Sequence, residues 1–225
     1  MVEERIEAAC RRASRAREEV RLMAVSKTHP APAIGEAAAA GLTLFGENRV
    51  QEFDAKHAEL PDGVEVHLIG HLQSNKASKA AAIFAAIDAV DSLRLLERLN
   101  EAARQAGRRL PVLLEIKLSN EGTKTGFDPA SVELQQMLER GPDLHHVDVC
   151  GLMTIAPLDE NPDSARACFR GLRGLRDELA RKHSGIDLRD LSMGMSGDYE
   201  IAIEEGSTLV RIGTALFGPR ERSAN

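Results

Sequence analysis

The chain has 225 residues, of which 43% are hydrophobic and 28% charged, and its formal net charge is −6. This composition is typical of a globular protein, and the acidic balance leaves no basic footprint for nucleic acid. The three cysteines stand at unrelated spacings, which predicts neither a disulfide framework nor a zinc site. The charged N-terminus and the lack of a long apolar run indicate no secretory signal and no membrane span, so we expect a cytoplasmic protein.

Short apolar runs alternate along the chain with stretches rich in alanine, leucine and charge that have a helical period. A first helix is predicted over residues 2–19. Asp91-Ser92 and Asp128-Pro129 are predicted to begin later helices that end at Gly107 and Gly141, and Asn161 or Asp163 begins a longer one. Further helices are expected after Pro30, Glu47 and Gln73. Eight strands are predicted at residues 22–27, 42–45, 65–69, 86–90, 111–118, 148–154, 189–193 and 208–212.

Eight successive strand–helix units imply a parallel sheet, and eight is the number that closes a (β/α)8 barrel. We therefore expect an α/β fold, a single TIM-type barrel over residues 1–225 with an extra N-terminal helix. A doubly wound open sheet is the alternative, but no Gly-x-Gly-x-x-Gly sequence follows the first strand. In a barrel of this type, functional residues lie where strands end and the following loops begin.

The loops after the last two strands contain mainly small and polar residues, at residues 192–198 and 211–215. Small residues let backbone N–H groups approach a ligand, and this part of the barrel is the recurrent phosphate site of the fold. Ser196 and Thr214 add hydroxyl groups. The alternative is that both loops are ordinary turns.

Two cations are predicted to point into the barrel. Alternation along the last strand directs Val210 and Ile212 outward, which leaves Arg211 inside, and the same parity places Lys27 inside at the end of the first strand. A buried cation needs a partner, which for Arg211 is either a carboxylate such as Glu115 or a ligand. A lysine amine, a phosphate cradle and a fixed guanidinium together suit pyridoxal 5'-phosphate. Lys117 is the rival for the lysine that forms the imine.

Several longer segments resemble the pyridoxal phosphate homeostasis protein family, whose fold is similar to the N-terminal barrel of alanine racemase. They are residues 24–28, 45–52, 67–76, 151–153, 193–198 and 210–218. The resemblance implies that Lys27 is the Schiff-base lysine, that Ser196, Gly213 and Thr214 bind the phosphate, and that Arg211 faces the pyridine nitrogen. It also implies that Asn48 lies near the cofactor. We count Met195, which precedes Ser196 in the loop after the seventh strand, among the binding residues.

The resemblance implies a protein that binds, buffers and delivers pyridoxal phosphate, with apo-enzymes as recipients and without established catalytic turnover. The alternatives are an amino-acid racemase-like enzyme, an aldolase that forms an imine on lysine, and a barrel without a cofactor. A racemase needs a second base, which His71 or Tyr199 would have to supply. His67 and His71 flank a strand end without carboxylates at ligand spacing, so we expect no metal. The chain has no Trp and few aromatic residues, and we expect a monomer.

Overall fold

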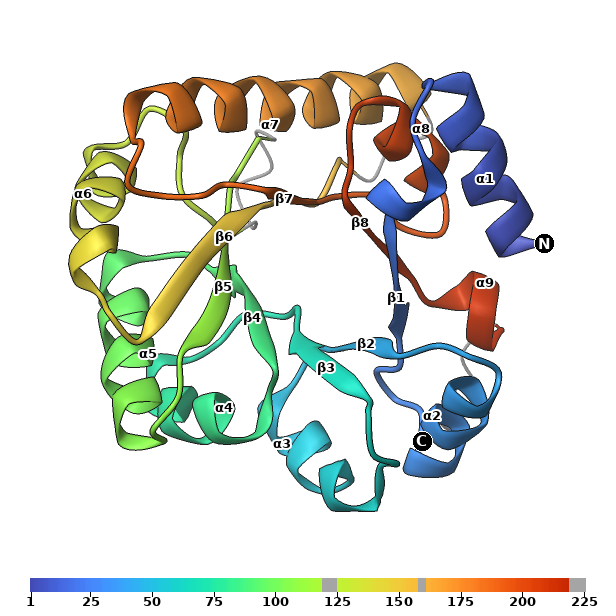
Figure 1. Ribbon diagram of the computed structural model, residues 1–225, viewed down its shortest axis with the longest axis horizontal. Helices are drawn as coiled ribbons and strands as arrows, with labels where there is room; N and C mark the ends of the chain where they lie inside the picture. The colour runs from blue at the N-terminus through green and yellow to red at the C-terminus, as the bar shows by residue number, and fades with distance from the viewer. Residues whose placement is uncertain (119–124, 158–160, 219–225) are drawn as a thin grey trace.

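Eight parallel strands form a closed barrel in strand order β1 to β8, and helices surround it (Figure 1). The computed structural model describes residues 1–118, 125–157 and 161–218. The predicted (β/α)8 barrel is confirmed. The strands are β1 Arg21–Val25, β2 Leu44–Glu47, β3 Glu65–Leu68, β4 Ala86–Val90, β5 Leu110–Glu115, β6 Val147–Met153, β7 Asp190–Ser192 and β8 Leu209–Ile212.

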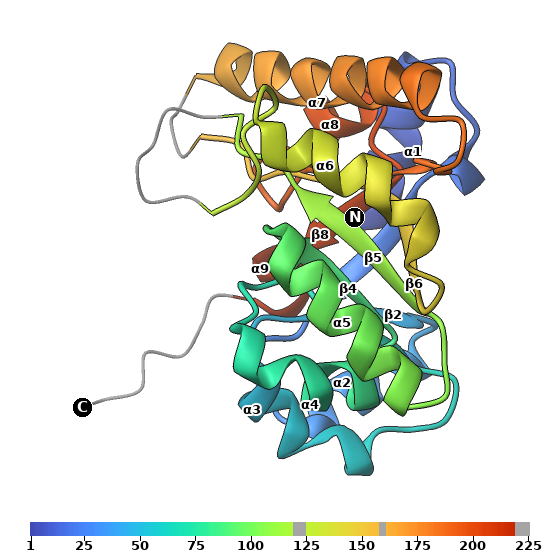
Figure 2. The same cartoon turned by 90° about the vertical axis from the view of Figure 1, so that its left-hand side faces the viewer.

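Helices follow the strands and form the outer layer. They are α1 Val2–Arg12, α2 Ala31–Ala39, α3 Val50–Asp54, α4 Ala77–Ile83, α5 Leu93–Gln105, α6 Val132–Arg140, α7 Pro162–Lys182, α8 Tyr199–Glu204 and α9 Thr214–Phe217. The largest cluster of buried apolar side chains lies between this layer and the strands. Figure 2 shows α5 and α6 against one side of the barrel wall. Within the described ranges, no helix is long and apolar enough to cross a membrane.

The N-terminal helix is shorter than predicted. It ends at Arg12, and a separate 3-10 turn covers Arg17–Glu19, because Ser14 takes a left-handed backbone conformation with φ of 54° that no helix can contain. The apolar side of α1 packs on α8 and β8 through a cluster that includes Ile6, Ala9 and Cys10. Figure 1 shows α1 and α8 side by side.

Two further boundaries differ from the prediction. The helix expected from Asp128 begins at Val132, and the Ser131 hydroxyl caps it by accepting the Leu134 N–H. The helix expected from Glu47 begins at Val50 and is short, because Glu47 is the last residue of β2 and pairs in register with Leu68 of β3. The caps at Ser92 and Asn161 are confirmed, since each side chain accepts a backbone N–H in the first turn of its helix.

The direction of the side chains along β1 and β8 agrees with the predicted alternation. Val210 and Ile212 belong to the outer cluster beneath α1. Met23 and Leu209 pack together in a different cluster with Leu44 of β2, inside the barrel. In the register of β1 with β8, Met23 lies beside Arg211. The barrel wall therefore carries the side chain of Arg211 inward.

Candidate functional site

A cavity of about 440 Å³ opens at the C-terminal ends of the strands. This volume lies within the range of roughly 300–1,000 Å³ that small-molecule sites occupy. Its lining brings together every residue predicted to bind a cofactor, although they come from four different loops or strand ends. These residues are Lys27, Asn48, Met195, Ser196, Arg211, Gly213 and Thr214.

Lys27 enters the cavity from the segment that follows β1. Val25, the last residue of that strand, also lines the cavity, and alternation places the side chain of Lys27 on the same inner face. The next residue, Thr28, has φ of 69°. This left-handed conformation is rare for a β-branched residue, so the chain turns sharply away directly after Lys27.

The loops after β7 and β8 are tied to each other at the cavity wall. The Ser196 hydroxyl accepts the Gly213 N–H at 3.3 Å. The Met195 N–H donates to the Asp198 carboxylate at 2.6 Å, and this contact restrains the loop after β7. Burial raises the pKa of Asp198, while the Met195 amide and the charge of Arg211 lower it. The helices that follow are short, since α8 has six residues and α9 has four.

Gly213 leaves room for a ligand at this wall. A Cβ added there would meet Val25 at 3.5 Å, which is ordinary van der Waals contact, and Val25 itself lines the cavity. The position is therefore open enough for a side chain yet carries none. Close approach of a ligand to the backbone is the usual reason for glycine at such a place.

Arg211 lies inside the barrel with 5% of its surface exposed. Its guanidinium donates to the Ser192 carbonyl at 2.8 Å, to the Ser192 hydroxyl at 2.7 Å and to the Thr154 carbonyl at 2.8 Å. Burial lowers the pKa of Arg211, and the charges of Asp88, Asp198 and Glu115 oppose this shift. Arginine nevertheless stays protonated in proteins. The cation is thus fixed in orientation by neutral acceptors from β7 and the end of β6.

Acidic and imidazole groups also line the cavity, and their arrangement was not predictable from the sequence. Glu115 and His71 both line it. The His71 Nδ1 lies 2.8 Å from Asp91 Oδ2, and the Thr125 hydroxyl donates to Glu115 at 3.0 Å. Burial raises the pKa of Glu115, the negative charge of Asp91 raises it further, and the Thr125 hydrogen bond lowers it. Thr125 is ten residues away from Glu115 in the sequence, and spacing alone could not predict this contact.

Some residues that the sequence singled out lie elsewhere. Tyr199 is 1% exposed and packs in the outer cluster with the Arg5 guanidinium 5.4 Å from its ring centre, so it does not serve the cavity. His67 pairs with Asp88 at 3.0 Å inside the barrel, away from His71. Lys117 is not among the described residues that line the cavity. In the part of the chain that the structure describes, no three His, Cys, Asp or Glu side chains gather to hold a metal ion.

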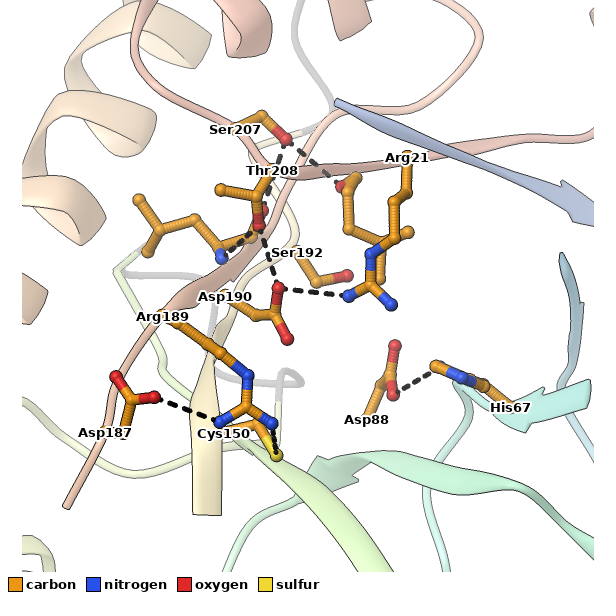
Figure 3. Close-up of polar contacts among 12 residues, drawn as sticks. Arg21, His67, Asp88, Cys150, Asp187, Arg189, Asp190, Ser192, Ser207 and Thr208 are labelled. Carbon is orange, nitrogen blue, oxygen red and sulfur yellow. Dashed lines mark hydrogen bonds and ion pairs between the residues drawn. The ribbon is translucent and has the colours of Figure 1, made fainter. Parts of the chain in front are cut away.

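A second cavity, of about 290 Å³, opens at the N-terminal ends of the strands. Figure 3 shows that several of its charged groups pair with one another or with a neighbouring carboxylate. Arg21 lies 3.0 Å from Asp190, and Arg189 contacts Asp187 at 3.3 Å. The thiol at this end, Cys150, has its pKa raised to about 12 by burial, which keeps it protonated and unreactive. This end of a barrel serves stability, so the first cavity is the candidate functional site.

The closed parallel barrel and the cavity at the C-terminal ends of its strands define a (β/α)8-barrel protein with a small-molecule site. Comparisons with known proteins agree with this class. Residues 2–221 match the family described as alanine racemase, N-terminal domain. The alanine racemase of Clostridium difficile 630 in complex with cycloserine superimposes with a TM-score of 0.76 over 98% of this chain and 60% of that chain. The two share only 16% of their residues, so this likeness shows the fold alone.

Nearer relatives specify the family. The pyridoxal phosphate homeostasis protein of Aquifex aeolicus is 44% identical over 97% of this chain and 95% of that protein. The protein of the same name from Escherichia coli K12 is 41% identical over 99% and 95% of the two chains. PipY of Synechococcus elongatus, solved with pyridoxal phosphate bound, is 44% identical, with a TM-score of 0.85 over 97% of this chain and all of that chain. The chain belongs to the pyridoxal phosphate homeostasis protein family.

The side chains of the cavity fit pyridoxal phosphate chemically. Lys27 offers an amine for the aldehyde, and Ser196 and Thr214 offer hydroxyl donors near Gly213, where no side chain fills the space. Arg211 offers a fixed cation at the barrel side of the cavity. The donor set thus matches an aldehyde at one end of a ligand and an anionic group at the other.

Proposed function

We propose that the protein binds pyridoxal 5'-phosphate in this cavity as a Schiff base on Lys27. We further propose that it serves vitamin B6 homeostasis in the cytoplasm by buffering the cofactor or delivering it to apo-enzymes. The observation that carries the proposal is the convergence of Lys27, Ser196, Gly213, Thr214 and Arg211 on one cavity. The names of the relatives and the bound pyridoxal phosphate in PipY support it.

The residues divide the work of binding. Pyridoxal phosphate supplies an aldehyde that condenses with a primary amine, and Lys27 supplies that amine. Ser196 and Thr214 hold the phosphate through their hydroxyl groups, and Gly213, which has no side chain, lets the phosphate approach closely. Asn48 and Met195 complete the wall beside it. The position of each residue on the cavity and the chemistry of its side chain support these proposed roles.

The environment of Arg211 favours storage of the cofactor over catalysis. A guanidinium that stays protonated and faces the pyridine nitrogen leaves that nitrogen without a proton. An unprotonated ring withdraws electrons less strongly than a protonated ring paired with a carboxylate, so carbanion chemistry receives little support. Ser192 and Thr154 fix the guanidinium in orientation, so it does not move away from this role. We therefore propose a protein without catalytic turnover.

One observation favours a second candidate, an amino-acid racemase-like enzyme. His71 lines the cavity together with Lys27 and is paired with Asp91, which is an arrangement that can accept and return a proton. A racemase of this kind would exchange the α-hydrogen of an amino acid with solvent. We expect no loss of α-deuterium when single deuterated amino acids are incubated with the loaded protein. Exchange that disappears in the Lys27→Ala and His71→Asn variants would favour the enzyme.

Delivery is tested by transfer of the cofactor. The loaded protein is freed of unbound pyridoxal phosphate and mixed with an apo-enzyme that needs it, and the recovered enzyme activity is followed. We expect full recovery from the wild-type protein and none from Lys27→Ala treated in the same way, because that variant carries no tethered cofactor through the separation. Equal recovery from both proteins would contradict delivery from Lys27.

A further inference from the structure

A buried ion pair on the outer side of the barrel wall contacts the segment that carries Lys27. Glu47 ends β2 and is fully buried, and Lys56 follows α3 with 8% of its surface exposed. The Lys56 Nζ lies 2.8 Å from Glu47 Oε1, and the same oxygen accepts the Ser26 hydroxyl at 2.6 Å. Alternation along β1 turns Ser26 away from the cavity and Lys27 toward it. The ion pair therefore holds the residue that precedes Lys27.

Lys56 and the neighbouring helix α3 also contact the two residues that follow Lys27. The Lys56 ammonium donates to the His29 carbonyl at 2.7 Å, so one cation connects to both sides of the lysine. The Thr28 N–H donates to the carboxylate of Glu52, which lies on α3 one turn before Lys56. The segment around Lys27 is thus fixed at the residue before it, Ser26, and at the two residues after it, Thr28 and His29.

The backbone of Thr28 needs such a restraint. Its φ of 69° is unfavourable for a β-branched residue. Conformations of this kind persist where the surroundings determine them, and they concentrate at functional sites. Here the surroundings are the carboxylate of Glu52 and the Glu47–Lys56 pair. Without these contacts, we expect the backbone at Thr28 to return to a more favourable conformation, which would move Lys27 away from its position in the cavity.

The restraint reaches the phosphate side of the cavity as well. The His29 ring stacks on Phe217 of α9, with ring centres 4.7 Å apart and planes at 26°. Helix α9 begins at Thr214, which lines the cavity. Lys56 fixes His29 by donating to the His29 carbonyl. His29 in turn connects the segment of Lys27 with the loop proposed to bind phosphate. Glu47 and Lys56 are not among the described residues that line the cavity itself.

We propose that Glu47 and Lys56 are positioning residues that keep Lys27 aimed at the cofactor and so set how slowly the protein gives the cofactor up. This inference rests on the proposed function, since it assumes a cofactor tethered to Lys27. A buried ion pair is weak evidence for a role in stability, because removal of two charges from water offsets most of their attraction. The contacts of Glu47 with Ser26 and of Lys56 with His29 instead support a role in positioning Lys27.

The test compares Glu47→Gln with Glu205→Gln. Both glutamates are buried and pair with cations, but Glu205 binds Arg166 and Arg170 on the outer layer at 2.9 and 3.0 Å. Each protein is loaded with pyridoxal phosphate, and the decay of the protein-bound cofactor is followed by the activity recovered in an excess of apo-enzyme that traps what is released. We expect the decay to be roughly 10- to 100-fold faster in Glu47→Gln, since small displacements of a reacting group have effects of this size. The control is expected to decay within about twofold of the wild type, because its substitution lies outside the restraint.

A double variant separates positioning from stability. Glu47→Gln with Lys56→Met removes both charges together, which leaves no buried charge unpaired. A purely structural pair predicts that the double variant regains both the melting temperature and the slow release of the wild type. Positioning predicts that release stays fast even where the melting temperature is regained. Ser26→Ala, which removes one contact and no charge, serves if Glu47→Gln does not fold and is also expected to speed release.

The outcomes are distinct from those of the proposed function. Wild-type release rates in Glu47→Gln and Ser26→Ala, with the cofactor still on Lys27, would overturn the positioning role and leave the proposed function intact. If borohydride leaves no cofactor on Lys27 of the wild-type protein, the proposed function itself fails and the positioning role fails with it.

Discussion

Replacement of Arg211 by Met tests whether this cation belongs to the architecture as well as to the site. Methionine fills a similar volume but donates no hydrogen bonds. The Thr154 carbonyl would lose the guanidinium donor that it meets at 2.8 Å. The Ser192 carbonyl would lose its donor from Arg211 but would keep the Thr154 N–H at 3.2 Å. The substitution therefore leaves chiefly one buried acceptor without a partner.

The expected cost follows from these contacts. A buried acceptor left without a donor costs about 1–3 kcal/mol, and the second carbonyl and the hydroxyl add a smaller loss. Relief from burying a cation offsets part of this. We expect the free energy of unfolding of the cofactor-free protein to fall by about 2 kcal/mol in urea titrations. Arg170→Met, at a side chain that is 64% exposed, is the control and is expected to stay within about 0.5 kcal/mol of the wild type. An equally small change in Arg211→Met would contradict a structural role for the buried guanidinium.

Three further predictions follow from the cavity and its surroundings. Burial and the charge of Asp91 raise the pKa of Glu115 above its ordinary value of 4.5, so the folded protein holds this proton more tightly than the unfolded chain does. The wild type therefore loses stability relative to Glu115→Gln as pH rises through the raised pKa, and urea titrations across pH would show the opposite sign if the carboxylate were stabilising. Gly213→Ala is expected to keep the wild-type melting temperature, since its Cβ meets only ordinary contacts near Val25, but to weaken pyridoxal phosphate binding measured by absorbance titration. Unchanged affinity would argue against phosphate at this loop. Tyr199→Phe is expected to leave cofactor affinity unchanged, because the ring packs beneath α1; a loss of affinity would place the hydroxyl in the site.

The sequence was sufficient to predict the barrel and the convergence of the site, because both depend on short-range patterns. Eight apolar runs with helical stretches between them determine the topology. Alternation along β8 determines the direction of Arg211, and the same parity extended past β1 determines that of Lys27. Polar residues at strand ends then meet at one end of the barrel without any knowledge of loop structure.

The Glu47–Lys56 pair and its contacts around Lys27 could not be predicted from such short-range patterns. The prediction ended the second strand at Phe45, because Gly46 and Glu47 are poor strand formers, whereas pairing with β3 extends it to Glu47. This tertiary pairing buries Glu47 and makes Lys56 its partner. The only local signal was the spacing of Glu52 and Lys56, which are four residues apart on one face of a helical turn. Contacts from Lys56 to residues thirty positions earlier depend on the closed fold.

The decisive property of this protein is the identity of the residue that carries the cofactor. The purified protein is incubated with pyridoxal phosphate, reduced with borohydride, digested and analysed by mass spectrometry. We expect a single major adduct of cofactor mass on Lys27, with none on Lys117 above the level seen for exposed lysines. An adduct chiefly on Lys117, or none on Lys27 at saturating cofactor, would contradict this expectation.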